Sequence, residues 1–491
     1  MAESKSSTRD ERIGLIQQLR ERKINPFPDR FERTHTLESA LTLPEGTENV
    51  RLAGRLIALR KMGKLSFGHI QDASAKIQVS FTQNDLGEEG YSFFKKFIDI
   101  GDFIGVEGYL FITKTGEKTL NVRSLRLLSK ALLTLPEKWH GLTDQEIRYR
   151  QRYLDLIVNE ESRKRFHIRR EVIRQIRNFL EQNDFIEVET PVLQSQPSGA
   201  LARPFVTHHN ALDIDLYLRI APETYLKRLI VGGYDRVFEF ARCFRNEGIS
   251  TEHLQEFLML EYYAAYWNYI DNMNFTERLI QTILQNMLGS LTVEYQGKIL
   301  DFSGSWPRKT FQELILERLD MDIHKDNTKA ALLARCREKN IGLEEIDVDS
   351  LGWGVLVDAV YKKTCRPAIV SPVFLTSHPK ELSPLARAND DNPAITDRFQ
   401  LVVAGMEICN AYSELVDPID QRERLLEQQR LRDSGDEEAM LSDEDYVHCM
   451  EYGMPPISGW GMGIDRFVAL ITNEENIKNT VYFPLMRPLS S

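Results

Sequence analysis

The alternation of apolar and polar residues in the N-terminal part of the chain predicts a small β-domain. Short runs rich in β-branched and aromatic residues are separated by glycine-containing segments, which is typical of strands joined by turns. The predicted strands span residues 50–59, 67–71, 76–81, 103–113 and 118–128, with a helix over residues 91–98. This is the layout of an OB-fold barrel, although other small barrels have the same propensities.

Helical spacing of apolar residues marks the rest of the chain. It predicts an amphipathic helix over residues 8–23, and a second helix around residues 172–180 that is followed by a strand over 185–191. Strands and helices then alternate irregularly, which indicates an α+β fold with a mainly antiparallel sheet. The predicted divisions are an N-terminal helix and tail (1–45), the OB-fold (46–132), a linker (133–165) and a larger domain (166–491) with a helical insertion at about 308–395.

The composition is that of an ordinary globular protein. Of 491 residues, 42% are hydrophobic and 27% are charged. The sequence has no apolar run long enough to span a membrane, and its polar N-terminus does not resemble a signal peptide. The five cysteines are scattered, which argues against a disulfide framework or zinc site and favours the reducing cytoplasm.

The net charge of −11 is unevenly distributed. Residues 51–130 contain thirteen Lys and Arg against eight Asp and Glu, a net of +5, which leaves −16 for the rest. Much of that negative charge falls in residues 433–445. A basic module on an acidic protein suits selective contact with a nucleic-acid backbone, but a solvated surface with a chance imbalance explains it equally well.

Two neighbouring segments predict a polar cleft beside a sheet. If residues 236–245 and 257–263 form a hairpin, strand parity places Arg245, Glu261 and Tyr263 on one face and an apolar set on the other. A structural alternative is that Arg245 and Glu261 only pair with each other. The long polar connection between the strands favours a functional site.

A glycine-rich strand leads into a helix near the C-terminus. Gly459, Gly461 and Gly463 share one strand face and permit close approach by a flat ligand or another strand. Arg466 follows in the first turn of the helix, where it suits an anion. Taken alone, the motif reads as a packing crossover with a surface arginine; together with Arg245, it predicts a polyphosphate clamp.

Several acids occur in apolar surroundings. Glu407, Asn410 and Glu414 lie in one strand-like run, where they could bind Mg²⁺ or an ammonium group. Their parity differs, so a bulge or bend is needed to bring them together. An edge strand with a solvated acidic face is the alternative. Glu223 begins a helix, a position that is also favourable for the helix dipole alone.

Together these segments resemble the signature motifs of class II aminoacyl-tRNA synthetases, and in detail those of the bacterial-type lysyl-tRNA synthetases. The resemblance extends over nearly the whole chain. Supporting motifs include Lys61-Met-Gly-Lys64, Lys114-Thr-Gly-Glu117, Thr207-His-His-Asn210 and Phe483-Pro-Leu-Met-Arg-Pro488. The resemblance implies an anticodon-binding OB-fold, an antiparallel catalytic domain and a homodimer with residues 172–191 at its interface. The implied reaction joins L-lysine to tRNA(Lys) through a lysyl-adenylate made from ATP.

The resemblance also implies residue roles. Arg245 would bind the α-phosphate of ATP, Arg466 the γ-phosphate, and Phe257 would stack on adenine. The implied ATP and Mg²⁺ contacts are Arg245, Glu247, His253, Phe257, Glu407, Gly463 and Arg466, with Glu407 as the Mg²⁺ ligand. The implied lysine pocket is Gly199, Glu223, Glu261, Tyr263, Asn410 and Glu414. The implied anticodon contacts are Phe67, Gln78, Arg60 and Glu117.

The chain departs from the family pattern at several positions. Gln400 replaces a usual Mg²⁺ carboxylate, which places one metal site in doubt. Leu254 removes a polar group near the phosphates, and Glu252 adds negative charge there. Activity is expected to survive, because Arg245, Arg466, Glu407 and the whole lysine pocket remain.

Three other interpretations stay open. A related enzyme for aspartate or asparagine would need a cation or a neutral donor in the pocket, against which the three glutamates argue. A diverged paralogue with a regulatory role is supported only by Gln400 and Leu254. A basic single-strand nucleic-acid-binding protein would leave the two arginine motifs unexplained.

Overall fold

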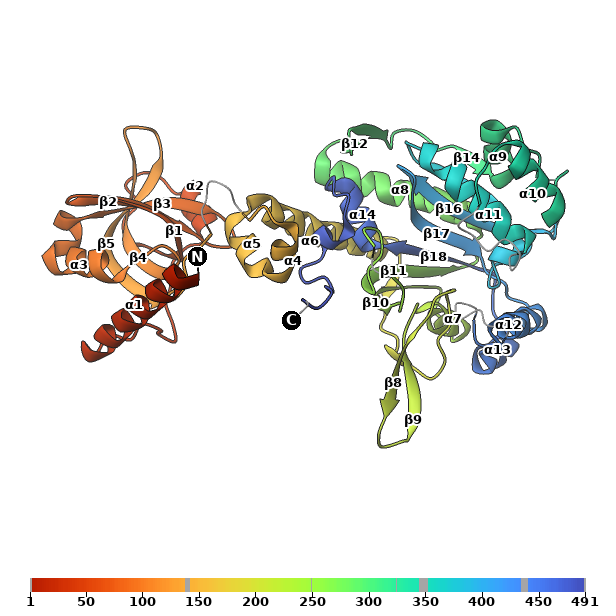
Figure 1. Ribbon diagram of the computed structural model, residues 1–491, viewed down its shortest axis with the longest axis horizontal. Coiled ribbons are helices and arrows are strands. Elements are labelled where there is room, and N and C mark those ends of the chain that lie inside the picture. Colours follow the sequence, from red (N-terminus) through yellow and green to blue (C-terminus); the bar gives the residue numbers. More distant parts are fainter. Residues whose placement is uncertain are drawn as a thin grey trace. The chain divides into compact units, whose positions relative to one another are not determined.

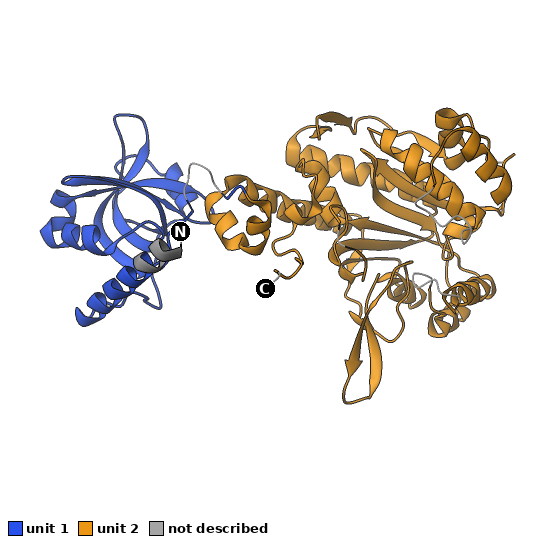
Figure 2. Cartoon of the chain, in the orientation of Figure 1, with its two compact units in different colours: residues 1–143 blue, residues 144–491 orange. Residues whose placement is uncertain are grey.

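The computed structural model describes residues 2–136, 142–248, 250–323, 325–343, 352–433 and 440–489, with side chains from residue 8 onward. The chain forms two compact units, Met1–Thr143 and Asp144–Ser491 (Figure 2). Residues 137–141 of the predicted linker and 434–439 of the acidic segment lie outside the described residues. Within the described ranges, no helix is both long and apolar enough to cross a membrane.

The first unit contains the predicted barrel. Its strands close in the order β1-β2-β3-β5-β4 (Figure 1). They are β1 (Val50–Met62), β2 (Leu65–Gln71), β3 (Lys76–Thr82), β4 (Phe103–Ile112) and β5 (Lys118–Ser129), accompanied by the helices α1 (Ala2–Glu21), α2 (Leu37–Thr42) and α3 (Gln83–Phe97). Helix α3 begins well before the predicted residue 91, because the Thr82 side chain caps it by accepting a hydrogen bond from the Asp85 N–H.

The second unit is built on an eight-stranded sheet in the order β14-β15-β16-β17-β18-β11-β10-β6. The pairs at its two edges, β14 with β15 and β6 with β10, are parallel, and the interior pairs are antiparallel. This confirms the predicted α+β fold with a mainly antiparallel sheet. The strands are β6 (Ile186–Glu187), β10 (Arg236–Phe244), β11 (Glu256–Ala265), β14 (Arg308–Thr310), β15 (Val373–Pro379), β16 (Ile395–Val403), β17 (Met406–Ser413) and β18 (Ile457–Gly463).

The main hydrophobic core lies on one face of this sheet. Phe238, Leu260, Tyr262 and Trp460 point from the sheet into this core and are buried. The helices that cover them are α6 (Glu160–Glu181), α8 (Tyr269–Leu288) and α14 (Ile464–Ile471). The opposite face is left to α7 (Glu223–Val231), α13 (Glu444–Glu451) and the cavity described below.

The predicted helical insertion at 308–395 is too long. Its helices α9 (Phe311–Leu319), α10 (Lys329–Glu338) and α11 (Trp353–Thr364) form a separate core with Leu375 and Val402. The residues on either side belong to the central sheet as β14 and β15. Other described elements are α12 (Pro418–Asp433), the hairpin β12 (Thr292–Tyr295) and β13 (Lys298–Asp301), and the small sheet of β7 (Leu193–Gln194), β8 (Phe205–His209) and β9 (Ile214–Leu218).

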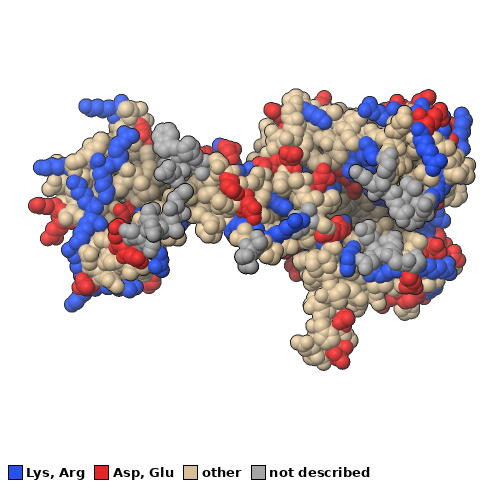
Figure 3. All heavy atoms as spheres, in the orientation of Figure 1, with Lys and Arg blue, Asp and Glu red and all other residues tan. Residues whose placement is uncertain are grey.

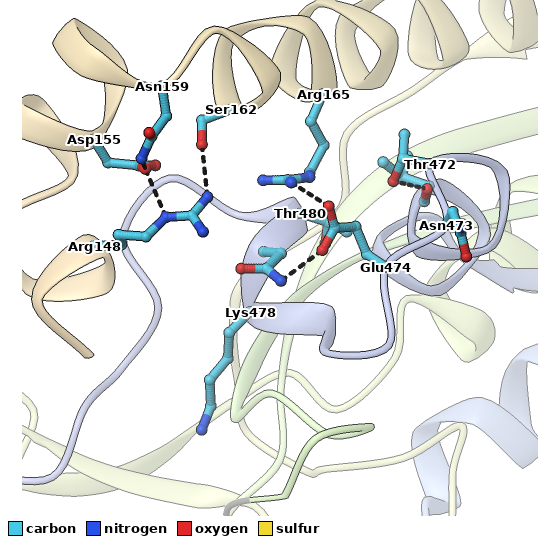
Figure 4. A network of polar contacts seen from close by, with 12 residues as sticks. Arg148, Asp155, Asn159, Ser162, Arg165, Thr472, Asn473, Glu474, Lys478 and Thr480 are labelled. Atoms are coloured by element: carbon cyan, nitrogen blue, oxygen red, sulfur yellow. Dashed lines mark hydrogen bonds and ion pairs between the residues drawn. The ribbon is translucent and has the colours of Figure 1, made fainter. Parts of the chain in front are cut away.

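The predicted linker also extends too far, because its second half folds into the second unit. Helices α4 (Gln145–Arg150) and α5 (Arg152–Val158) carry a buried charge cluster, in which Arg152 Nη1 donates to Asp155 Oδ2 at 2.6 Å and Arg148 Nε donates to Asp155 Oδ1 at 2.8 Å. On the neighbouring α6, Arg165 pairs with Glu474 near the C-terminus (Figure 4). These contacts tie the helices to the end of the chain.

Candidate active site

An open cavity of about 330 Å³ lies on the face of the central sheet opposite the main core. Its walls come from β11, β16, β17, β18, the starts of α7 and α14, and the loops around them, including Arg245 directly after β10. The residues predicted for ATP or lysine that line it are Gly199, Glu223, Arg245, Glu247, His253, Phe257, Glu261, Tyr263, Glu407, Asn410, Gly463 and Arg466. Glu414 and Gln400 lie outside the lining and contact residues that belong to it or lie directly behind it.

The strands β10 and β11 form the predicted antiparallel hairpin. Glu239 pairs with Glu261 and Cys243 with Phe257, which places the polar set on the cavity face. Arg245 lies over the Phe257 ring, 5.1 Å from its centroid, and makes no ion pair with Glu261 in the described part of the chain. Its Nε is buried without a hydrogen-bond partner there. A buried guanidinium nitrogen that lacks an acceptor suits an anionic ligand.

The glycine strand serves both packing and the cavity. A Cβ on Gly459 would collide with the Glu414 carboxylate and the Tyr263 ring, so the packing alternative holds for this position. Gly461 and Gly463 line the cavity and have more room. Arg466 begins α14 and donates from Nη1 to the Glu407 carbonyl at 2.7 Å, which anchors its side chain at the cavity wall.

A bulge brings together the acidic residues of β17. The register shifts between Leu401 and Val402, which pair with Cys409 and Glu407 respectively, so Ile408 is the extra residue. This is the irregularity that the differing parity required, and both Glu407 and Asn410 line the cavity as a result. The side-chain Oδ1 of Asn410 accepts a hydrogen bond from Arg398 Nε at 2.8 Å.

The Mg²⁺ site implied by the family can be tested on the donors present. Gln400 Nε2 donates to Glu407 Oε2 at 2.8 Å across β16 and β17. The site therefore offers one carboxylate and, with the amide turned, one amide oxygen. Mg²⁺ commonly takes one or two carboxylates together with substrate phosphates. The residues fit such an ion, with less negative charge than two carboxylates would supply.

The acidic pocket, which is formed by Glu223, Glu261 and Glu414, contains a cation that was not predicted from the sequence. Lys227 Nζ donates to Glu223 Oε1 at 2.6 Å and pairs with Glu414, and both the Lys227 and Glu414 side chains are 0% exposed. Burial lowers the pKa of Lys227, but the two carboxylates outweigh it and raise the pKa above its ordinary value. Lys227 follows Glu223 by one helical turn, which is the available sequence signal.

Two tyrosines complete the acidic pocket. Tyr263 Oη donates to Glu261 Oε2 at 3.0 Å, and Tyr412 Oη donates to Glu223 Oε1 at 2.6 Å. Burial foremost, and the nearby Glu223 next, raise the pKa of the Glu261 carboxyl well above its ordinary value. A cationic ligand beside Glu261 would stabilise its charged form.

Gly199 closes the pocket at a position that only glycine fits. Its φ of +88° lies in the left-handed region, and an added Cβ would come within 2.8 Å of the Glu223 Cβ. On the opposite side, the Ser250 hydroxyl and His253 Nδ1 are 2.9 Å apart. The departures Glu252 and Leu254 also line this side of the cavity.

The predicted anticodon residues gather on the outer face of the barrel. Arg60 on β1 pairs in register with Phe67 on β2, and Gln78 on β3 pairs with His69. Gln78 Nε2 and His69 Nε2 contact the two oxygens of Glu117 at 2.7 and 2.8 Å. The sequence reasoning missed His69, which its spacing of two from Phe67 would have indicated. Lys and Arg side chains are prominent on the face of this unit seen in Figure 3.

Comparisons with known proteins identify a family for each of the two units. Residues 144–487 match the family of class II tRNA synthetases (D, K and N), and residues 50–128 match the OB-fold nucleic acid binding domain of the tRNA anticodon type. A lysine–tRNA ligase of Pelotomaculum thermopropionicum is 49% identical over 96% of this chain and 93% of its own length.

Two further relatives are also lysine–tRNA ligases. The lysine–tRNA ligase of Carboxydothermus hydrogenoformans is 48% identical over 97% of both chains, and that of Legionella pneumophila is 47% identical over 94% of both. The antiparallel sheet, Arg245 and Arg466 in the cavity, and these full-length matches lead to one conclusion. The chain belongs to the class II tRNA synthetases of the aspartate, lysine and asparagine group.

Proposed function

We propose that this protein joins L-lysine to tRNA(Lys) in two steps that consume ATP and release pyrophosphate and AMP. The observation that carries the proposal is the cavity wall formed by Glu223 and Glu261. Two buried carboxylates would repel an aspartate side chain, and an asparagine amide would leave their charge unbalanced, whereas an ammonium group balances it. The relatives named above are lysine–tRNA ligases, which supports the same substrate.

In the first step, the lysine carboxylate attacks the α-phosphorus of ATP, and pyrophosphate leaves. Arg245 binds the α-phosphate and offers its unpartnered Nε to the charge that develops there. Arg466 and His253 hold the terminal phosphates, while Phe257 stacks on adenine and Glu247 accepts from its amino group. In the second step, the terminal ribose hydroxyl of the tRNA attacks the lysyl carbonyl, and AMP leaves. The side chains act by positioning and by charge, without a protein nucleophile.

Mg²⁺ is part of the proposal, held by Glu407 with Gln400 beside it. When bound, the ion neutralises charge on the ATP phosphates. Asn410, Gly463 and Gly199 shape the cavity around the two substrates, and Arg398 is suited to the lysine carboxylate because it lines the cavity as a cation.

The barrel is proposed to read the anticodon. Phe67 supplies a stacking surface, and Gln78 a hydrogen-bonding edge, with Arg60 and Glu117 beside them. The net charge of +5 over residues 51–130 supports contact with a phosphate backbone.

The proposal also includes assembly as a homodimer and location in the cytoplasm. Exposed apolar side chains cluster near the predicted interface, at Ile186, Val192 and Leu193, which are 52%, 40% and 49% exposed. Such a cluster suits burial against a second copy. The five cysteines are free, which fits a reducing compartment.

The test is ATP–pyrophosphate exchange with each of the twenty amino acids while Mg²⁺ is titrated. Exchange with lysine alone is the expected outcome. In Gln400→Glu, a second carboxylate beside Glu407 should lower the Mg²⁺ concentration for half-maximal exchange; Gln400→Met, which has no oxygen, should not. Absence of exchange with any amino acid would favour the diverged-paralogue interpretation, for which Gln400 and Leu254 are the specific observations.

A further inference from the structure

The wall of the acidic pocket and the layer directly behind it contain more carboxylates than one substrate ammonium can balance. Glu223, Glu261 and Glu414 are all buried, at 5%, 5% and 2% exposure. Three ionised carboxylates around one bound cation would leave a large uncompensated charge in a region that excludes water. Lys227 supplies a second, permanent cation behind the wall, since neither it nor Glu414 lines the cavity.

The hydrogen bonds divide the carboxylate oxygens into two sets. Oε1 of Glu223 accepts from both Lys227 and Tyr412, and Oε2 of Glu261 accepts from Tyr263. In the described part of the chain, Oε2 of Glu223 and Oε1 of Glu261 accept no hydrogen bond. Both of these carboxylates line the cavity. An ammonium group has three donors and suits two such acceptors.

We propose that Lys227 is a specificity-determining residue of the lysine pocket. Its ammonium group balances Glu414 and orients Glu223, so that Glu223 and Glu261 each present one free, ionised oxygen to the substrate ammonium. This inference rests on the proposed function and deepens it. Lys227 is a positioning residue, because it acts through Glu223 and lies outside the cavity wall.

The surroundings of Lys227 reinforce this role. Its Nζ lies 5.9, 5.6 and 5.9 Å from the ring centroids of Tyr263, Tyr412 and Tyr446, which come from β11, β17 and α13. The rings stabilise the cation by cation–π attraction and exclude water. The charged groups that face it are Glu223 on α7 and Glu414 after β17, with Glu261 on β11 and Arg398 on β16 farther out.

Removal of Lys227 should therefore change protonation in the pocket. Burial raises the pKa of the Glu414 carboxyl, and the ammonium of Lys227 opposes that rise. Lys227 also lowers the pKa of Glu261, against the burial that raises it. Without Lys227, the pKa of both carboxyl groups should rise further, which favours their protonated forms. A protonated carboxyl donates a hydrogen bond and no longer selects for an ammonium group.

The experiment compares the full-length chain with Lys227→Met and with the double variant Lys227→Met/Glu414→Gln, which has the net pocket charge of the original. ATP–pyrophosphate exchange gives KM and kcat for lysine between pH 6 and 9, and the KM for ATP. The same assay is run with 6-hydroxynorleucine, in which a neutral hydroxyl replaces the ammonium. Circular dichroism reports whether each variant is folded.

For Lys227→Met, the expected result is a KM for lysine raised by roughly 10- to 100-fold at pH 7, from the loss of one hydrogen bond between charged groups. That KM should fall as the pH rises, the preference for lysine over 6-hydroxynorleucine should shrink, and the KM for ATP should stay unchanged. The double variant should restore both the pH profile of the unmodified chain and its preference for lysine.

Two results would overturn the inference. One is a folded Lys227→Met variant with the original pH profile and the original preference for lysine, which would make Lys227 merely structural. If Lys227→Met does not fold, the double variant decides, because replacing both members of a buried ion pair is tolerated better than removing one. A folded double variant that had lost the preference would show that charge balance is not the cause. Lack of lysine-dependent exchange in the unmodified chain would instead overturn the proposed function.

Discussion

At the scale of single residues, the arginines of the cavity differ in the hydrogen bonds that they already make. Arg245 stacks on Phe257 while its Nε has no acceptor in the described part of the chain. Arg466 is held by the Glu407 carbonyl. Arg466 is therefore anchored through Nη1 before a ligand binds, whereas Arg245 keeps a buried Nε that still lacks an acceptor.

Replacement of Arg245 by alanine should lower kcat for lysyl-adenylate formation by about 10²–10³-fold, because it removes a donor aimed at charge that develops in the transition state. ATP–pyrophosphate exchange measures this directly. The matched control is Arg242→Ala on the same strand, whose guanidinium pairs with the exposed Glu256 at 3.4 Å. Equal losses in the two variants would contradict the assignment.

At the scale of elements, the ends of strands and helices place the functional groups. The bulge at Ile408 turns Glu407 and Asn410 toward the same cavity. Helix α7 carries Glu223 at its start and Lys227 one turn later. Helices α4 and α5 are fixed by Asp155, whose carboxylate receives both Arg148 and Arg152.

Asp155→Asn should destabilise the second unit by about 3–5 kcal/mol, because it leaves buried arginines without their counter-ion. Urea unfolding followed by tryptophan fluorescence can measure this, since Trp267, Trp306, Trp353 and Trp460 lie in that unit. The control is Glu427→Gln, which breaks an exposed pair with Arg430 and should cost less than about 1 kcal/mol.

The difference in stability between the unmodified protein and Asp155→Asn should also depend on pH. Burial raises the pKa of Asp155, but hydrogen bonds, that from Asn159 foremost, outweigh it and hold the pKa below its ordinary value. A lowered folded-state pKa contributes stability above the unfolded-state pKa of about 4, and the contribution disappears as pH falls through the folded-state pKa. The two proteins should therefore converge in stability only in acid. A difference that stayed constant down to a pH of about 2 would count against the charge explanation.

At the scale of the whole molecule, the two compact units contain different proposed binding sites. The residues that line the cavity proposed to bind lysine and ATP come from the second unit, and the proposed anticodon residues come from the first. Adenylate formation and tRNA selection should therefore respond to different substitutions.

Phe67→Ala should raise the KM for tRNA in aminoacylation by roughly 5- to 150-fold, which corresponds to the loss of one base stacked on an aromatic ring. Lysine-dependent ATP–pyrophosphate exchange without tRNA should remain unchanged. Tyr109→Ala provides a control, because this aromatic residue lies on β4, away from β2 and β3. A parallel loss of exchange in Phe67→Ala would indicate misfolding and would contradict a role confined to tRNA.

Local periodicity was sufficient for part of the fold and of the site. The barrel strands and the shared face of Phe257, Glu261 and Tyr263 follow from the two-residue repeat of a strand, which does not depend on distant contacts. The two ends of the predicted insertion were wrong, because β14 has only three residues, and β14 and β15 owe their place in the sheet to pairing with each other and with β16 rather than to local propensity.

The sequence by itself determined the strand faces, the arginines and glycines beside them, and the need for a bulge between Glu407 and Asn410. Only the tertiary structure decided which charges meet. Lys227 and Glu414 are far apart in the chain, yet they form a fully buried pair. Periodicity assigns a residue to a face of its own element, whereas the partner across the core depends on how separate elements pack, and that packing fixes which carboxylates are already neutralised.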